Sequence, residues 1–188
     1  WEVGGYSITS SIKEQQTIEL AVKQGHVHPV TTFLHQSAQI GDRVEISPGQ
    51  GDCIYQRPMG DEVVLIAGGI GVTPLMSILR SIDDCWPEVK ILLLYSAKNP
   101  TDFAFQAELK ERIQRNPNIQ CVYRVTQTNH DPNWIEKRGR MDLAFLKKQN
   151  LSLKALYYLC GPQKMIASLS HELTTLDIPA SNIHYEKW

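Results

Sequence analysis

The chain has 188 residues, of which 42% are hydrophobic and 21% are charged, a composition typical of globular proteins. Nineteen basic and twenty acidic side chains leave a formal net charge of −1, which excludes the strongly basic surface of a general nucleic-acid-binding protein. The most apolar stretch, residues 63–79, is shorter than the ~20 apolar residues of a membrane-spanning helix, so we expect no transmembrane segment.

The first third of the chain is predicted to form strands. The three stretches with the Val-, Ile- and Thr-rich pattern of strands are 5–11, 17–23 and 43–47. One short helix is expected near Val30–Gln36. Because three strands leave open sheet edges, these residues predict only part of an antiparallel barrel.

The second part alternates between short apolar runs and amphipathic stretches. Strands are expected at 63–67, 89–95, 119–125, 155–160 and 182–186. Helices are expected at 74–81, 101–115, 141–149 and 162–176. This alternation predicts a doubly wound parallel α/β sheet. The Gly- and Pro-rich segment Pro48–Gly60 then indicates the junction, with a first domain at 1–59 and a second at 60–188.

Two motifs follow expected strands at the edge of this sheet where ligands bind. The first, 67-AGGIGVTPL-75, contains G-x-G-x-x-P and opens a helix, an arrangement that lets the backbone approach a pyrophosphate. The second, 160-CGPQKM-165, follows the fourth strand, whose end faces the same crevice. A glycine turn kept for packing and a buried thiol at Cys160 are the structural alternatives.

Metal binding is not expected. The four cysteines, at 53, 85, 121 and 160, contain no CxxC pair and are expected to be reduced thiols. His26, His28 and His35 lie within ten residues but lack the spacing of a ligand set.

The combined motifs resemble the ferredoxin–NADP reductase superfamily, flavoenzymes with a flavin-binding barrel followed by a nicotinamide-binding domain. Besides the two motifs above, 6-YS-7 resembles half of the R-x-Y-S/T flavin motif, and 185-YEKW-188 resembles the acidic–aromatic tail of such reductases. The resemblance covers essentially the whole chain. It implies two cofactors, FAD and NAD(P)H.

The resemblance also implies roles for individual residues. Ser7, Cys160 and Glu186 would be the catalytic residues around flavin N5 and the nicotinamide ring. The flavin would contact Tyr6, Ser7, Val22, Lys23, Thr31, Thr32 and Trp188. The nicotinamide dinucleotide would contact Gly68, Gly69, Gly71, Val72, Thr73, Pro74, Ser96, Lys98, Cys160, Gly161, Pro162 and Met165. As structural alternatives, Tyr6 would be a core aromatic, Thr31 and Thr32 an ordinary helix cap, and Trp188 a frayed end.

The expected function is that of an NAD(P)H-dependent flavin oxidoreductase that passes hydride to flavin N5 and electrons to an unidentified acceptor. The alternative is a non-catalytic, reductase-like scaffold subunit of a larger assembly. Gly4 favours the alternative, because it stands where the flavin motif has an arginine that pairs with the pyrophosphate. The resemblance suggests a mitochondrial location, with a cytoplasmic one otherwise.

Overall fold

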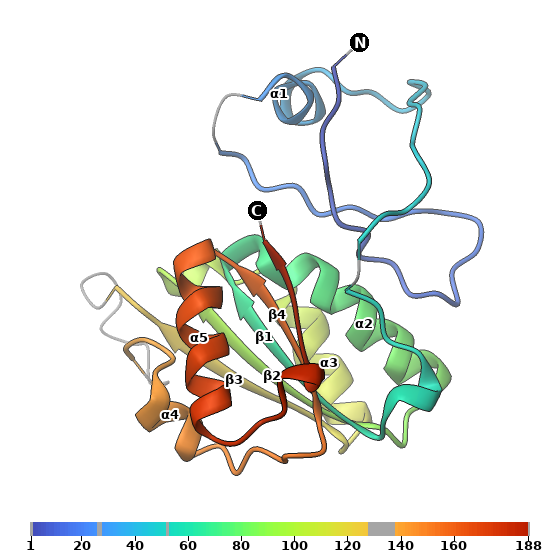
Figure 1. The fold of residues 1–188 in the computed structure, drawn as a ribbon. Helices are drawn as coiled ribbons and strands as arrows, with labels where there is room; N and C mark the ends of the chain where they lie inside the picture. The colour runs from blue at the N-terminus through green and yellow to red at the C-terminus, as the bar shows by residue number, and fades with distance from the viewer. Residues whose placement is uncertain (1, 26–27, 52, 128–137, 188) are drawn as a thin grey trace.

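The computed structural model describes residues 2–25, 28–51, 53–127 and 138–187 (Figure 1). Its helices are α1 (Pro29–Gln36), α2 (Val72–Cys85), α3 (Gln106–Arg115), α4 (Leu143–Lys147) and α5 (Gln163–Thr175). Its strands are β1 (Glu62–Gly68), β2 (Lys90–Ala97), β3 (Ile119–Val125), β4 (Leu156–Gly161) and β5 (Ile183–Lys187). We refer to the described residues up to Gly60 as the N-terminal segment.

The five strands form one parallel sheet in the order β3-β2-β1-β4-β5. The chain therefore starts in the middle at β1, runs outward to β3, and returns across β1 to build β4 and β5. Figure 1 shows α2 and α3 on one face of this sheet and α4 and α5 on the other. The predicted doubly wound α/β architecture is confirmed.

The pattern of buried residues explains this layering. In β1, Val63, Leu65 and Ala67 belong to the core beneath α2 and α3, whereas Val64 and Ile66 belong to the core beneath α4 and α5. Successive strand residues point to opposite faces, so a strand covered on both sides must be apolar at nearly every position. The helices contribute residues at helical spacing, such as Leu75, Leu79 and Ile82 of α2 and Leu169 and Leu173 of α5.

The N-terminal segment departs from the predicted strands. Only one antiparallel bridge, Ile8 with Leu20, forms among its described residues, so the expected partial flavin barrel is not observed. Val44 and Ile46, which carry the strand pattern of residues 43–47, are 69% and 68% exposed. A strand requires a neighbour for its backbone hydrogen bonds, and an alternating pattern alone does not supply one. The short helix expected near Val30–Gln36 is present as α1.

Most of the N-terminal segment lies beyond the carboxyl ends of the strands, near the end of β5, and its last residues run down beside α2 to the start of β1 (Figure 1). Hydrogen bonds tie this segment to α2, to β4 and, through Arg57, to Glu88 and Asp61. Ser77 Oγ of α2 donates to the Ser10 carbonyl at 2.8 Å, and the Tyr158 hydroxyl of β4 donates to the Ile54 carbonyl at 2.8 Å. Within the described residues, no helix has the length and apolar character needed to cross a membrane.

Candidate functional site

The turn between β1 and α2 combines a left-handed glycine with a helix N-terminus. Gly69 has φ +56°, and a Cβ atom built on it would meet nothing within 4 Å. The 14-residue helix α2 begins three residues later at Val72. Backbone N–H groups at a helix N-terminus favour anions. The backbone at Gly69 is therefore open to a phosphate-bearing ligand.

The neighbouring glycines are required by packing. A Cβ atom on Gly71 would lie 2.4 Å from the Cys160 carbonyl oxygen, so the turn touches the end of β4 directly. A Cβ atom on Gly68 would lie 2.9 Å from Pro162 Cδ, and one on Gly161 would lie 3.0 Å from Gly68 Cα, in addition to 2.7 Å from the end of the Met165 side chain in both cases. Close packing thus explains a glycine at Gly68, Gly71 and Gly161, whereas the space beside Gly69 is open. A binding role for these four glycines stays a prediction.

The residues that open α2 shape this turn. The Thr73 hydroxyl donates to the Ile70 carbonyl at 3.0 Å, and the side chain is only 1% exposed. Val72 and Pro74 are also buried. The Thr73 hydrogen bond thus fixes the turn, and the binding role expected for these three residues stays a prediction.

At the carboxyl edge of the sheet, Cys160 and Glu186 come together. The register places Ala67 of β1 opposite Cys160 of β4, and Cys160 opposite Glu186 of β5. Cys160 is fully buried and Glu186 is half-buried. A Cβ atom on Gly51 would lie 3.8 Å from Glu186 Oε1, so the N-terminal segment reaches this edge. Two of the three expected catalytic residues are therefore adjacent, while Ser7 is half-buried in the N-terminal segment.

Cys53 joins this cluster, although its place in a Gly- and Pro-rich junction does not predict such a role. Its half-buried side chain packs against the core that contains Cys160. Burial raises the pKa of the Cys53 thiol to about 12, and the negative potentials of Cys160 and Glu186 add to this effect. Cys53 is therefore a protonated thiol at neutral pH. The N-terminal segment closes over Cys160 at this point.

Among the residues expected to contact the flavin, Tyr6 and Thr31 meet. The Tyr6 hydroxyl and Thr31 Oγ1 share a hydrogen bond of 2.7 Å. Thr31 and Thr32 lie in the first turn of α1, whose N-cap is His28, so the alternative that the threonines cap this helix is wrong. A Cβ atom on Gly4 would lie 2.5 Å from Tyr6 Cε2. The Tyr6 ring thus lies over the position where the family motif carries arginine.

The other described residues expected to contact a ligand lie near the ends of β2 and β4 and in the N-terminal segment. Ser96, 8% exposed, pairs with Gly68 in the sheet register, and the exposed Lys98 follows the end of β2. Pro162 is exposed at the N-cap of α5. The Val22 carbonyl hydrogen-bonds His35 Nε2 at 3.0 Å, and Lys23 is exposed. Trp188 lies outside the described residues.

Comparison with known proteins agrees with this geometry. Residues 65–171, which include the glycine turn and β4, match the family model described as "Oxidoreductase NAD-binding domain". Oxidoreductase NAD-binding domain-containing protein 1 of Homo sapiens is 32% identical over 207 residues, covering 99% of this chain and 65% of that protein. Its Danio rerio counterpart is 32% identical over 206 residues, covering 99% of this chain and 75% of that protein. A flavohemoprotein of Xylella fastidiosa is 26% identical, and the chain spans only 42% of its length.

Solved structures share the fold. The Flavohem-like-FAD/NAD binding domain of nitric oxide dioxygenase from Vibrio cholerae superposes with a TM-score of 0.83 at 24% identity, covering 97% of this chain and 76% of that one. The cytochrome P450 reductase GcoB of Amycolatopsis superposes with a TM-score of 0.81 at 25% identity, covering 97% of this chain and 55% of that one. The chain belongs to the oxidoreductase NAD-binding domain family, within the ferredoxin–NADP reductase-like superfamily.

Proposed function

We propose that the chain is an NAD(P)H-dependent flavin oxidoreductase. The observation that carries this proposal is the pairing of an open, left-handed Gly69 at the start of α2 with the adjacent Cys160 and Glu186 across β4 and β5. One end of the sheet thus brings an open glycine turn beside these two side chains, which supports a dinucleotide site there. When bound, the nicotinamide supplies a hydride and the flavin accepts it.

In this proposal the residues of the chain bind and orient. The backbone at Gly69 and the N-terminus of α2 hold the dinucleotide phosphates. Lys98, exposed beyond β2, lies where the adenosine end of a dinucleotide is expected, and no acidic side chain occurs in 95-YSAKN-99 to select the ribose of NAD. Both NADH and NADPH are therefore proposed as donors.

Cys160 and Glu186 are proposed to contact the nicotinamide side of the reaction. Gly51 lies close to Glu186, and Cys53 packs against the core that contains Cys160. Such cover favours an aligned site with little water, which is what hydride transfer requires. Because Cys160 is fully buried, a ring that reaches its thiol must displace part of this cover. The protonated Cys53 thiol adds no charge that would oppose such a movement.

The test is reduction of added FAD at saturating NADH or NADPH under anaerobic conditions. The rate is measured from the loss of FAD absorbance. We expect Cys160→Ser, which keeps the volume nearly constant, to slow this reduction at least tenfold while leaving the unfolding midpoint within a few degrees. Cys85→Ser, at the far end of α2, is the matched control and should reduce flavin at the wild-type rate. Equal rates in all three proteins would contradict a role for Cys160.

A second candidate is a scaffold subunit that keeps the fold without bound flavin. The observation that favours it is Gly4, where the Tyr6 ring occupies the position of the family's arginine. Under this proposal the chain binds NAD(P)H but neither binds nor reduces FAD. The same anaerobic experiment therefore distinguishes the two candidates.

A further inference from the structure

A short stretch of the N-terminal segment, residues 9–12, lies along one face of α2. Ser77 Oγ donates to the Ser10 carbonyl at 2.8 Å, Arg80 Nη1 donates to the Thr9 carbonyl at 2.8 Å, and the Ile12 N–H donates to Ser81 Oγ at 3.0 Å. The three helix positions are separated by three and four residues, so they share one face. This stretch begins two residues after Ser7, and α2 begins directly after the glycine turn. The contact therefore connects the proposed flavin side to the proposed nicotinamide side.

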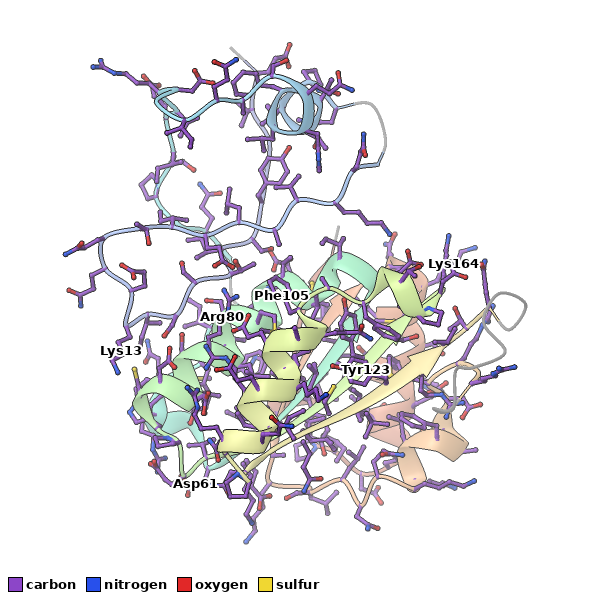
Figure 2. The ribbon with its side chains drawn as sticks, turned by 180° about the vertical axis from the view of Figure 1, so that it is seen from behind. Lys13, Asp61, Arg80, Phe105, Tyr123 and Lys164 are labelled. Atoms are coloured by element: carbon purple, nitrogen blue, oxygen red, sulfur yellow. The ribbon has the colours of Figure 1, made fainter. Side chains whose placement is uncertain are left out.

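Arg80 is the centre of this contact. Its Nε and Nη2 atoms donate to both carboxylate oxygens of Glu108 at 2.7 and 2.6 Å, and Nη1 donates to Glu19 Oε1 at 2.6 Å. Glu19 also accepts a hydrogen bond from Thr9 Oγ1 at 2.7 Å. Arg80 is 9% exposed, and its guanidinium lies 5.2 Å from the centre of the Phe105 ring, which Figure 2 shows beside it. One side chain thus joins α2, α3 and the N-terminal segment.

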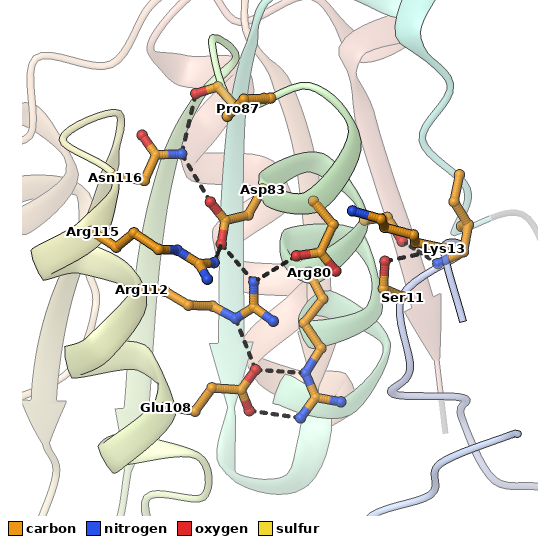
Figure 3. A network of polar contacts seen from close by, with 12 residues as sticks. Ser11, Lys13, Arg80, Asp83, Pro87, Glu108, Arg112, Arg115 and Asn116 are labelled. Carbon is orange, nitrogen blue, oxygen red and sulfur yellow. Dashed lines mark hydrogen bonds and ion pairs between the residues drawn. The ribbon is translucent and has the colours of Figure 1, made fainter.

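The partner on α3 is itself held in place, as Figure 3 shows. Arg112 Nε donates to Glu108 Oε1 at 2.8 Å, and the Arg112 and Arg115 guanidinium groups each donate to Asp83 Oδ2 at 2.5 Å. Asn116 Nδ2 donates to Asp83 Oδ1 at 3.0 Å. Because α3 fixes Glu108, the bidentate pair fixes the plane of the Arg80 guanidinium. Nη1 then points at Thr9 and Glu19.

We propose that Arg80 is a positioning residue that holds the stretch after Tyr6 and Ser7 in a fixed place relative to the glycine turn. This inference rests on the proposed function and deepens it. Only arginine has a planar fork that can hold Glu108 with one edge while a third nitrogen binds Thr9 and Glu19. Hydride transfer depends steeply on the alignment of the two rings, and a misplacement of ~1 Å is able to cost ~100-fold in rate.

The experiment uses the full 188-residue chain with saturating FAD and compares the wild type with Glu19→Gln and Arg80→Lys. Glu19→Gln keeps the size of the side chain and removes the charge that faces Arg80. The matched control is Glu62→Gln, which removes an exposed ion pair with Lys90 on the sheet. Two quantities are measured in each protein: amide hydrogen exchange of residues 8–20 and of the strands, and the rate of flavin reduction at saturating NAD(P)H.

We expect Glu19→Gln and Arg80→Lys to raise the amide exchange rate of residues 8–20 at least tenfold. The exchange rates of β1–β5 should not change. Flavin reduction should slow at least tenfold, while the Kd for NAD(P)H stays within about twofold of wild type. The control variant should match wild type in every measurement. Unchanged exchange in both variants would overturn the clamp, that is, the hold of Arg80 on residues 9–12 against α2. Faster exchange with a wild-type reduction rate would overturn the positioning role, since Arg80 would then be a structural tether only.

The two levels of the inference fail separately. If the wild-type chain reduces no flavin at saturating FAD and NAD(P)H, the proposed function fails and the positioning role fails with it. The exchange measurement needs no flavin chemistry. In that case, faster exchange in Glu19→Gln still supports the clamp between the N-terminal segment and α2, and unchanged exchange overturns it.

Discussion

Gly69 and Gly71 lie two residues apart, but a side chain is disfavoured at each of them for a different physical reason. The Cys160 carbonyl leaves no room for a side chain at Gly71. Gly69 has open space beside it, but its left-handed backbone conformation costs other residues free energy. The sequence motif contains both and does not separate them. Their substitution therefore separates a packing requirement from a binding requirement.

We expect Gly71→Ala to destabilise the protein by about 3 kcal/mol or more, because its methyl group would overlap the backbone of β4. Gly69→Ala should cost only about 1–2 kcal/mol for the left-handed conformation and should weaken NAD(P)H binding more than stability. Urea denaturation and coenzyme titration measure the two effects. Equal stability losses in the two variants would show that the space around Gly69 is not open.

Lys98 offers a second test at this scale. It is exposed just beyond the end of β2, where a positive charge favours the 2′-phosphate of NADPH over the 2′-hydroxyl of NADH. Lys98→Glu is expected to weaken NADPH binding about tenfold or more and to leave NADH binding nearly unchanged. Dissociation constants for both coenzymes give the answer, with Lys90→Glu, at the opposite end of β2, as the control. Equal effects on both coenzymes would refute a phosphate contact.

At the scale of elements, the sheet could be predicted from sequence and the N-terminal segment could not. Strands buried on both faces are apolar at nearly every position, so a strand was predicted at 63–67, where the structure has β1 at Glu62–Gly68. The stretch 43–47 shows strand-like alternation, yet Val44 and Ile46 have no partner strand among the described residues. Pairing depends on residues far away in the chain. Cys53 was missed for the same reason, because only the fold brings it beside Cys160.

The contact between α2, α3 and the N-terminal segment is expected to weaken in acid. The hydrogen bond from Arg80 lowers the pKa of Glu19. Burial raises the pKa of Glu108 and Asp83, but their bonds to arginines and Asn116 outweigh it, so both pKa values lie below the usual range. Carboxyl groups with lowered pKa values contribute stability that is present above their unfolded values of 4.5 and 3.8 and is lost as pH falls through the folded values.

The free energy of unfolding should therefore decrease as the pH falls below about 4.5. Urea denaturation between pH 7 and pH 3 measures it, and Glu19→Gln should show a smaller decrease than the wild type because it lacks one of the three carboxyl groups. Glu111→Gln, which removes an exposed carboxyl group on α3, is the control for a loss of acidic charge in general. A free energy that stays constant down to pH 3 would contradict the prediction.

For the whole molecule, the two proposed binding regions depend on different parts of the chain. The glycine turn belongs to the parallel sheet, whose two cores come mainly from its own strands and helices, with Tyr55 and Cys53 of the N-terminal segment packed at one of them. The flavin-side residues Tyr6 and Thr31 belong to the N-terminal segment, which contains one helix and one bridge among its described residues. A ligand of the sheet is therefore expected to bind a preformed site, and a flavin is expected to order its site as it binds, at a cost in affinity.

We expect the 188-residue chain to bind NAD(P)H more tightly than FAD. Gly4 removes a charge-assisted hydrogen bond to the flavin pyrophosphate, worth about 1.5–3 kcal/mol or a tenfold to hundredfold change in Kd. Gly4→Arg should not restore tight binding, because its Cβ would lie 2.5 Å from Tyr6 Cε2 and displace the ring that holds Thr31. Gly5→Arg is the matched control, since a Cβ there meets nothing within 4 Å. Fluorescence titrations with FAD and with NADH measure both affinities, and sub-micromolar, stoichiometric FAD binding by the wild-type chain would contradict the prediction.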